Sequence, residues 1–397
     1  MPKHFVNIYP RPKQKASGLL GRDADFLGRY EAFNYKHKIS SAGGYDTASF
    51  ELAVYEVDAD FWFDRLGCEV KIYIDNPARP AWEGYVNRVN WAIGALTYTS
   101  SLDELNNRVS VAYSAPSVAA TPQRTTAVDN TASQAIYGVK EGGIDGYLIE
   151  GTDVTKMDAL QAMVLSTQAY PQKSTVFNPQ GQGAGLLSVE CYGWYHALDW
   201  VKYTETTASA VDADQMMTQI LATYPNDEFF EVTDAKITVN PSFAQNPNSR
   251  INQTYWEMFQ SIQEAGDGSS RWVMGITPTD FNSGLRYFYY RQCSTTVKYI
   301  LRASEGRVRD IYGQLVDPWL VRPDAGCRVA DYAIGWNKLV GDDPTTFYID
   351  TVDYDANSQS VQFGSTDNIT SEGSFNLRRY FQTTGRRFGA KNRRNWS

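Results

Sequence analysis

Side chains suited to acid–base or nucleophilic catalysis are sparse in this sequence. Its 397 residues include three histidines, and only His196 lies close to a cysteine, Cys191. Two residues five positions apart on one strand point to opposite faces of a sheet, so this spacing does not favour a thiolate–imidazole pair. We interpret both as structural residues. The other histidines, His4 and His37, have no evident partner in the sequence.

Carboxylates are plentiful but form no recognisable site. Asp58-Ala59-Asp60 and Asp212-Ala213-Asp214 could hold a divalent cation, yet Asp-x-Asp beside a helix start is typical of capping. A carboxylate pair for glycoside cleavage stays open, because 45 acidic residues are available and their separations are not readable from the sequence. The motifs H-E-x-x-H and G-x-S-x-G do not occur. We therefore predict no enzymatic activity, no catalytic residues, no metal and no cofactor.

The cysteines and one glycine-rich segment also lack a chemical signature. Cys68, Cys191, Cys293 and Cys327 form no C-x-x-C pair, so free buried thiols are predicted. Residues 179–185 contain G-x-G-x-G, but no strand before them and no helix after them complete a nucleotide-binding fingerprint. We interpret this segment as a flexible loop.

The net charge of -8 conceals an uneven distribution along the chain. Residues 378–397 carry seven Lys or Arg residues and no acid, and the first 40 residues are also basic, which leaves an acidic body. An acidic body argues against general nucleic-acid binding by the folded core. We expect the basic tail to dock on an acidic neighbour. The predicted partner-docking residues are Arg386, Arg387, Lys391, Arg393 and Arg394.

Composition indicates a β-rich protein that does not insert into a membrane. The first residues lack the apolar segment of a signal peptide, and no run approaches the length of a membrane span, so we expect synthesis in a reducing cytoplasm. Aromatic residues make up 14% of the chain, which suits both β-sheet cores and protein interfaces.

Alternation of apolar and polar residues predicts strands in the N-terminal third. Residues 48–55 show the period-two pattern of a half-buried strand. Further strands are predicted at 68–74, 81–90 and 95–99, with a short helical or turn segment at 61–66 that points Phe61, Trp62 and Leu66 inward. Several short strands with this turn spacing are typical of a small sandwich or barrel.

A similar strand pattern occurs twice in the sequence. Gly67-Cys68-Glu69-Val70 is followed by the run from Val86 to Trp91, and Gly326-Cys327-Arg328-Val329 is followed by the run from Ile349 to Tyr354. Each copy closes on a second alternating run, at 95–98 and at 360–363. We interpret this as a duplicated β-module whose second copy, opening near Leu187, is split by an insertion.

The predicted fold class is α+β, mainly β, with two homologous antiparallel β-barrels in one chain. The second barrel is interrupted by a helix-containing insert domain. The predicted parts are residues 1–114 for the first barrel with an N-terminal arm, 115–184 and 205–318 for the inserted α/β domain, 185–204 and 319–376 for the second barrel, and 377–397 for the basic tail.

Three helices and three strands are predicted inside the insertion. The helices cover about 155–170, 213–224 and 254–265, and their apolar stripes should face the core. Strands are predicted at 271–276, 286–292 and 296–302. The residues expected on the buried stripes are Met157, Leu160, Val164, Thr167, Met216, Met217, Ile220, Leu221, Tyr224, Tyr255, Phe259 and Ile262.

In their order along the chain, these patterns resemble the bacteriophage tail-hub or baseplate-hub family. The resembling pieces cover most of residues 40–365 and none is diagnostic alone. They are Gly43-Gly44-Tyr45-Asp46-Thr47-Ala48-Ser49-Phe50, the strand at Gly67-Cys68-Glu69-Val70, Trp82-Glu83-Gly84-Tyr85-Val86, the segment 101–109, Tyr137-Gly138-Val139-Lys140-Glu141, and the segment from Trp256 to Gly268.

The resemblance implies a structural virion protein of the phage tail tip, assembled in the host cytoplasm. In that family two barrels per subunit and three subunits per ring give a pseudo-sixfold ring. Such a homotrimer joins a six-fold tail tube or distal tail protein to a three-fold tip, spike or fibre protein, contacts the tape measure protein, and lets DNA pass through its lumen without specific binding. The long basic C-terminal tail departs from the simplest hubs.

Two other readings stay open. The chain could be a distal tail protein or a carbohydrate-recognising host-binding protein of the tail tip, with exposed Tyr and Trp stacking on sugars. It could also be an enzyme that degrades cell wall, which turnover of peptidoglycan would reveal. These readings rest on fold-level analogy and differ from the hub in oligomeric state and ligand.

Overall fold

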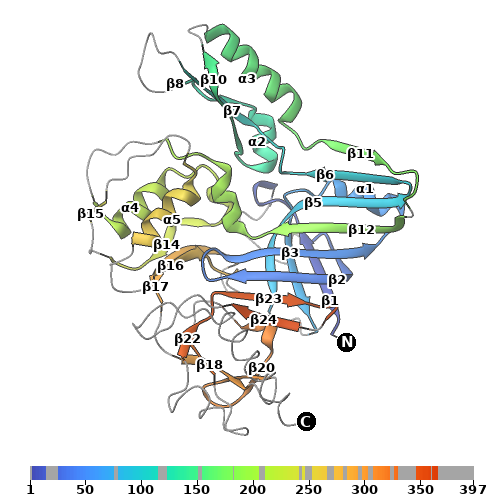
Figure 1. The fold of residues 1–397 in the computed structure, drawn as a ribbon, viewed down its shortest axis with the longest axis vertical. Helices are drawn as coiled ribbons and strands as arrows, with labels where there is room; N and C mark the ends of the chain where they lie inside the picture. The colour runs from blue at the N-terminus through green and yellow to red at the C-terminus, as the bar shows by residue number, and fades with distance from the viewer. Residues whose placement is uncertain are drawn as a thin grey trace, which may run out of the picture.

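The computed structural model describes most of the chain, with gaps. The described residues are 2–14, 26–75, 79–114, 123–150, 154–181, 183–204, 211–240, 244–245, 253–265, 272–279, 284–293, 297–302, 307–321, 326–329, 346–358 and 360–364. Strands dominate, so the predicted α+β, mainly β class is confirmed. Figure 1 shows a central β-barrel with a helix-bearing unit above it, a second one beside it and a small sheet below it.

Six antiparallel strands close into a ring. In spatial order around the ring they are β1 (His4–Tyr9), β4 (Glu69–Ile74), β5 (Trp82–Gly94), β12 (Gly183–Tyr192), β3 (Gly44–Ala53) and β2 (Gly28–Ser40), and β2 pairs back to β1. Closure leaves no open edge within the ring, which protects a barrel from unwanted strand pairing. The sequence predicts residues 1–40 as an arm or loop with a strand at 5–9. That strand is confirmed as β1, but residues 4–9 and 28–40 are barrel wall and not a free arm.

Alternating side chains fill the ring. Phe50 and Leu52 of β3 and Val89 of β5 point inward and are at most 2% exposed. The helix α1 (Glu56–Phe63) brings Trp62 into this core, where its ring meets Phe50 edge-on. The close approach of β5 and β12 explains one glycine, because a Cβ at Gly84 would lie 2.1 Å from the carbonyl oxygen of Tyr192. The predicted inward positions of Trp62 and Leu66 are confirmed, whereas Phe61, also predicted inward, is only half-buried.

One strand predicted for the second barrel belongs to the first. Residues 185–204 were expected to open the second copy, but β12 lies between β5 and β3 and closes the first ring. The physical reason is its alternation, because Leu187, Val189 and Cys191 are fully buried and complete the core of that ring. Alternation identifies a half-buried strand but not its neighbours.

The C-terminal strands of the predicted second copy also divide between sheets. The hairpin β23 (Thr351–Asp355) and β24 (Ser360–Gly364) joins the barrel sheet, because β23 pairs with residues 36–40 of β2 beyond the point where β1 ends. Residues 326–329 form β21, which pairs with β18 (Val297–Arg302) and β22 (Thr346–Tyr348) in a separate five-stranded sheet. Within the described residues, this second copy therefore forms no ring of its own.

The barrel sheet also extends outward through a long strand. The end of β5 pairs with β6 (Leu96–Ser101), and β6 pairs with β11 (Lys173–Phe177). Residues 173–177 were assigned to the insert domain from sequence, yet their pairing places them in the barrel sheet. In Figure 1 these strands project to the right of the barrel.

Two helix-bearing units flank the barrel. The first, at the top of Figure 1, combines α2 (Thr131–Tyr137) and α3 (Val154–Gln168) with a small sheet. The second combines α4 (Ala213–Ala222) and α5 (Tyr255–Ala265) with a three-stranded sheet. The strands of these units are β7 (Arg108–Ser114), β8 (Gln123–Arg124), β9 (Val128–Asp129), β10 (Glu141–Glu150), β13 (Val211–Asp212), β14 (Glu231–Ile237), β15 (Ala244–Gln245), β16 (Trp272–Ile276) and β17 (Tyr287–Gln292).

The predicted helices are confirmed, and most of their buried stripes with them. All eight predicted positions on α4, α5 and the turn after α4 are buried. On α3, Met157 is buried, Leu160 and Val164 are only half-buried, and Thr167 is exposed. The remaining elements are β18 (Val297–Arg302), β19 (Arg307–Asp310), β20 (Leu315–Val316), β21 (Gly326–Val329), β22 (Thr346–Tyr348), and the 3-10 helices η1 (Pro12–Gln14), η3 (Trp194–Trp200), η4 (Asp227–Phe229) and η5 (Pro318–Leu320).

Candidate functional site

The predicted docking residues of the basic tail, Arg386, Arg387, Lys391, Arg393 and Arg394, lie outside the described residues. Their role stays a prediction. The candidate sites described below come from three other regions: a groove on the barrel, a buried seam between the barrel and the α4–α5 unit, and the projecting strands.

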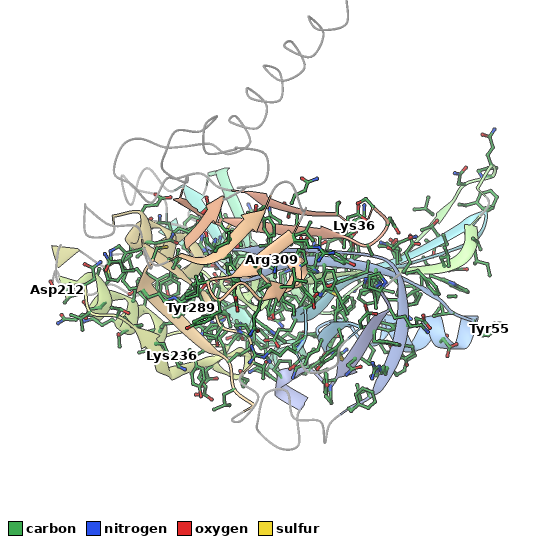
Figure 2. All side chains as sticks on the ribbon, turned by 90° about the horizontal axis from the view of Figure 1, so that it is seen from below. Lys36, Tyr55, Asp212, Lys236, Tyr289 and Arg309 are labelled. Atoms are coloured by element: carbon green, nitrogen blue, oxygen red, sulfur yellow. The ribbon has the colours of Figure 1, made fainter. Side chains whose placement is uncertain are left out.

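A groove of about 690 Å³ lies where β2, β3 and β12 meet the β23–β24 hairpin. Its walls come from segments far apart in sequence, and most of its side chains are polar. Lys36, labelled in Figure 2, forms an ion pair with Asp355 at 3.0 Å across it. The other charged and aromatic side chains that line it are Lys38, Glu190, Asp353, Tyr192 and Tyr354.

A carboxylate beside this groove is fully engaged. Asp46 Oδ1 accepts a hydrogen bond from Tyr195 Oη at 2.6 Å and lies 2.9 Å from His196 Nε2. Burial alone would raise the pKa of Asp46, but the hydrogen bonds from His196 and Tyr195 and the nearby positive charges lower it. Burial and Asp46 together raise the pKa of Tyr195, so its hydroxyl stays neutral. The cluster thus joins β3 to η3 and contains no free acid–base group.

Cys191 and His196 do not act as a pair. Cys191 is fully buried in the barrel core, and burial raises the pKa of its thiol well above the ordinary value. His196 instead stacks on Tyr192, with the ring centroids 4.7 Å apart, and faces Asp46. A neutral buried thiol is not a nucleophile. The structure thus places the two side chains in separate surroundings.

The other two histidines join the C-terminal hairpin to the barrel. His4 Nε2 lies 2.9 Å from Tyr354 Oη, and His37 Nδ1 lies 2.7 Å from Tyr35 Oη, all in one aromatic cluster. Burial lowers the pKa of His4, with the charge of Asp75 acting against it. The sequence could not reveal these partners, because Tyr354 is 350 positions from His4.

A fully buried ion pair connects the barrel to the α4–α5 unit. Arg286 donates from Nη2 to Glu69 at 2.9 Å and from Nε to the carbonyl of Phe229 at 2.7 Å, and both charged side chains are 0% exposed. Its guanidinium also lies 3.7 Å from the ring centroid of Trp194. A second polar contact follows nearby, where Glu83 accepts hydrogen bonds from the backbone and hydroxyl of Thr279. We call these two contacts the buried seam.

The two Asp-x-Asp motifs lie in or beside helices, and the predicted capping is seen only for Asp58. Asp58 in the first turn of α1 accepts from the backbone of Tyr55 at 3.4 Å. Asp212 occupies the N-cap position of α4, although its side chain makes no capping hydrogen bond, and Asp214 accepts from the backbone of Asn240. Across the described part of the chain, no cluster of three His, Cys, Asp or Glu side chains is placed to hold a metal ion.

The projecting strands expose apolar side chains. We define the arm as residues 92–94 of β5 and residues 183–186 of β12, together with β6 and β11; it is distinct from the N-terminal segment. All five residues of β11 are exposed, and Phe177 is 66% exposed. Figure 2 shows these strands rising at one end of the molecule, above the labelled Tyr55. The large exposed apolar residues of the arm are Ile93, Val176, Phe177 and Leu186. This surface was not predicted from the sequence, although two adjacent apolar residues, Val176 and Phe177, beside the glycine-rich segment 179–185 indicate exposed apolar side chains.

Comparison with known proteins gives structural neighbours only. No protein-family model matches the chain, and no curated protein matches it in sequence. The crystal structure of the tail protein from Neisseria meningitidis MC58 is 7% identical and has a TM-score of 0.42, covering 91% of this chain and 94% of its own. The 43 kDa tail protein of prophage MuSo2 from Shewanella oneidensis is 9% identical with a TM-score of 0.36, covering 93% and 97%.

A third neighbour is the lidless PdpA–VgrG complex, 10% identical with a TM-score of 0.29 over 73% of this chain and 35% of that chain. All three TM-scores are below 0.5, so the likeness carries no functional argument here.

Proposed function

We propose that this chain is a non-enzymatic structural protein of a bacteriophage tail hub that assembles as a homotrimeric ring. The observation that carries the proposal is the barrel sheet itself. It closes around a fully packed core yet continues outward into an arm whose edge strand and apolar side chains are exposed. A surface of this kind marks a protein interface. The sequence resemblance supports the choice of a tail hub.

Each subunit would place two β-units in the ring, the closed barrel and the five-stranded sheet that contains β18 to β22. Three copies then present six β-units, which suits a junction between a six-fold tail tube and a three-fold tip or spike. The acidic body would give the lumen a negative wall that repels DNA and lets it slide. A basic lumen in the purified ring would contradict this part.

The chemistry of the described residues fits a structural role. The two pairings most suggestive of catalysis, Cys191 with His196 and Asp46 with Tyr195, consist of a neutral buried thiol and of groups fully engaged in hydrogen bonds. No helix in the described residues has the length and apolarity to cross a membrane. A virion location, with the tape measure protein and the tube or distal tail protein as further partners, completes the proposal.

The test is the solution mass and symmetry of the purified protein. Light scattering should give three times the chain mass of 44.6 kDa, and electron microscopy should show rings with three-fold symmetry. A monomer or a hexamer at micromolar concentration would overturn the trimeric hub.

The groove favours one alternative, a carbohydrate-recognising tail-tip protein. It offers carboxylates, lysines and the half-buried ring of Tyr192, which are groups that bind sugar hydroxyls and sugar faces. Binding on a glycan array that is lost in Tyr192→Ala would support this alternative over a purely structural hub.

A further inference from the structure

The edge strand β11 is unprotected. In the described part of the chain it pairs with β6 alone, and its other side faces outward with all five residues exposed. Natural edge strands are usually blunted by charge, proline or a bulge. β11 has no proline, and its single charge, Lys173, lies over the ring of Phe63 and 4.0 Å from Asp60. The end of the strand that carries Val176 and Phe177 has no such protection.

Cross-strand registers place apolar side chains on both faces of the arm. Phe177 lies opposite Leu96, which lies opposite Ile93, so these three share one face. On the other face, Val176 lies opposite Thr97, and the same row of paired residues includes Ala92 and Leu186. A strand added along β11 would extend both rows and cover Val176 and Phe177, which are 59% and 66% exposed.

A matching edge lies at the other end of the same sheet. β24 also has five residues, and among the described residues it pairs with β23 alone. Its sequence Ser-Val-Gln-Phe-Gly contains no charge and no proline. If the two strands pair antiparallel over their full length, Val176 faces Val361 and no like charges meet. The charges and side chains of the two edges are therefore compatible.

We propose that β11 of one copy of this chain pairs with β24 of the next copy, which joins the barrel sheets of neighbouring subunits head to tail. This inference rests on the homotrimer of the proposed function and names the surface that builds it. A contact between two different edges is heterologous, and it forms a closed ring when the rotation between copies closes. Main-chain hydrogen bonds supply the affinity of such strand addition, and the side chains of Val176 and Phe177 supply its specificity.

The first experiment substitutes the exposed edge. The double variant Val176→Lys/Phe177→Asp should raise the dissociation constant of the trimer at least tenfold in analytical ultracentrifugation. Its circular dichroism spectrum should match that of the wild type, because both residues are exposed and their substitution leaves the subunit fold intact. Met163→Lys on α3 is the matched control, since Met163 is 57% exposed and lies away from the edge. It should leave the trimer unchanged.

The second experiment identifies the partner strand. Val176→Cys and Val361→Cys chains, each in a Cys327→Ser background with the three buried thiols retained, are mixed and oxidised. Cβ atoms of directly opposed residues are close enough for a disulfide, so the mixture should give a heterodimer that neither chain gives alone. A covalent dimer of the Val176→Cys chain alone would show that β11 pairs with its own copy and would overturn the proposal.

The two proposals fail in different ways. A monomeric wild type overturns both the trimeric hub and the β11–β24 contact. A wild-type trimer that tolerates Val176→Lys/Phe177→Asp overturns the β11–β24 contact and leaves the hub standing. In that case the arm docks on another tail component, which binding of the purified trimer to tail tubes would reveal.

Discussion

The two ends of the barrel differ in how far the rest of the chain covers them. At one end, strand β5 begins with Trp82 and Glu83, which are both 0% exposed, and Glu83 contacts the α4–α5 unit in the buried seam. At the other end, the same strand runs into the arm, where Ile93 is 43% exposed. Figures 1 and 2 place the α4–α5 unit and the arm on opposite sides of the molecule. The chain thus covers one end of the barrel with its own residues, whereas the other end stays exposed and available to partners.

Breaking the buried seam should have the largest effect. Glu69→Ala leaves the Arg286 guanidinium buried without its carboxylate, which should destabilise the fold by about 4 kcal/mol. Urea unfolding in the Val176→Lys/Phe177→Asp background, at a protein concentration where that background is monomeric, measures the loss without interference from assembly. The double variant Glu69→Ala/Arg286→Met should recover at least half of the loss. A single-variant loss below about 1 kcal/mol would mean that the seam is not what holds the two units together.

The contrast along β5 can be tested with two residues on the same face. Trp91 is 7% exposed and stacks on Tyr98, whereas Ile93 is two positions further along the strand. Trp91→Ala should cost about 3 kcal/mol of unfolding free energy because it leaves a cavity. Ile93→Ala should change it by no more than about 0.5 kcal/mol. If both substitutions destabilise the subunit equally, the arm is part of the core and the contrast is wrong.

The Asp46 cluster should have an intermediate effect. Asp46→Asn keeps the shape of the side chain but weakens its contacts to Tyr195, His196 and Lys38, with an expected loss of about 1–2 kcal/mol. Tyr195→Phe removes one of these hydrogen bonds and should cost about 1 kcal/mol. Thermal unfolding measures both. A larger loss in Tyr195→Phe than in Asp46→Asn would show that the tyrosine, not the carboxylate, organises the cluster.

Acid should weaken the junction of the C-terminal hairpin, and this is the smallest expected effect. Burial lowers the pKa of His4 in the folded state, so the His4 imidazole binds a proton more readily in the unfolded chain than in the folded chain. The contribution of neutral His4 is therefore complete above pH of about 6.5 and declines as pH falls below it. Urea midpoints at pH 7.5 and pH 5.5 should show a smaller difference in His4→Phe than in the wild type. An equal or greater difference would assign the acid sensitivity to other groups.

Local patterns predicted most elements of this fold, and long-range pairing could not be predicted. The strands near 68–74, 81–90 and 95–99 and the stripes around Met217 and Phe259 follow from periodicity alone. Periodicity says nothing about neighbours, so β12 was assigned to the wrong ring. The seam was also invisible, because Glu69 and Arg286 are 217 positions apart and neither has an unusual local context. The arm was missed because β11 alternates too weakly to distinguish an exposed edge from a loop.

The late position of β12 has a consequence for synthesis. Strands β3 and β5 leave the ribosome well before Gly183, because the whole α2–α3 unit is translated between β5 and the strand that separates them. During that interval β3 and β5 each have one edge without its partner strand. The β12 strand of a neighbouring nascent chain on the same messenger RNA could pair with these edges. Strand exchange between growing chains is a hazard of such topologies. The α2–α3 unit, by folding first, would hold β12 close to its own chain.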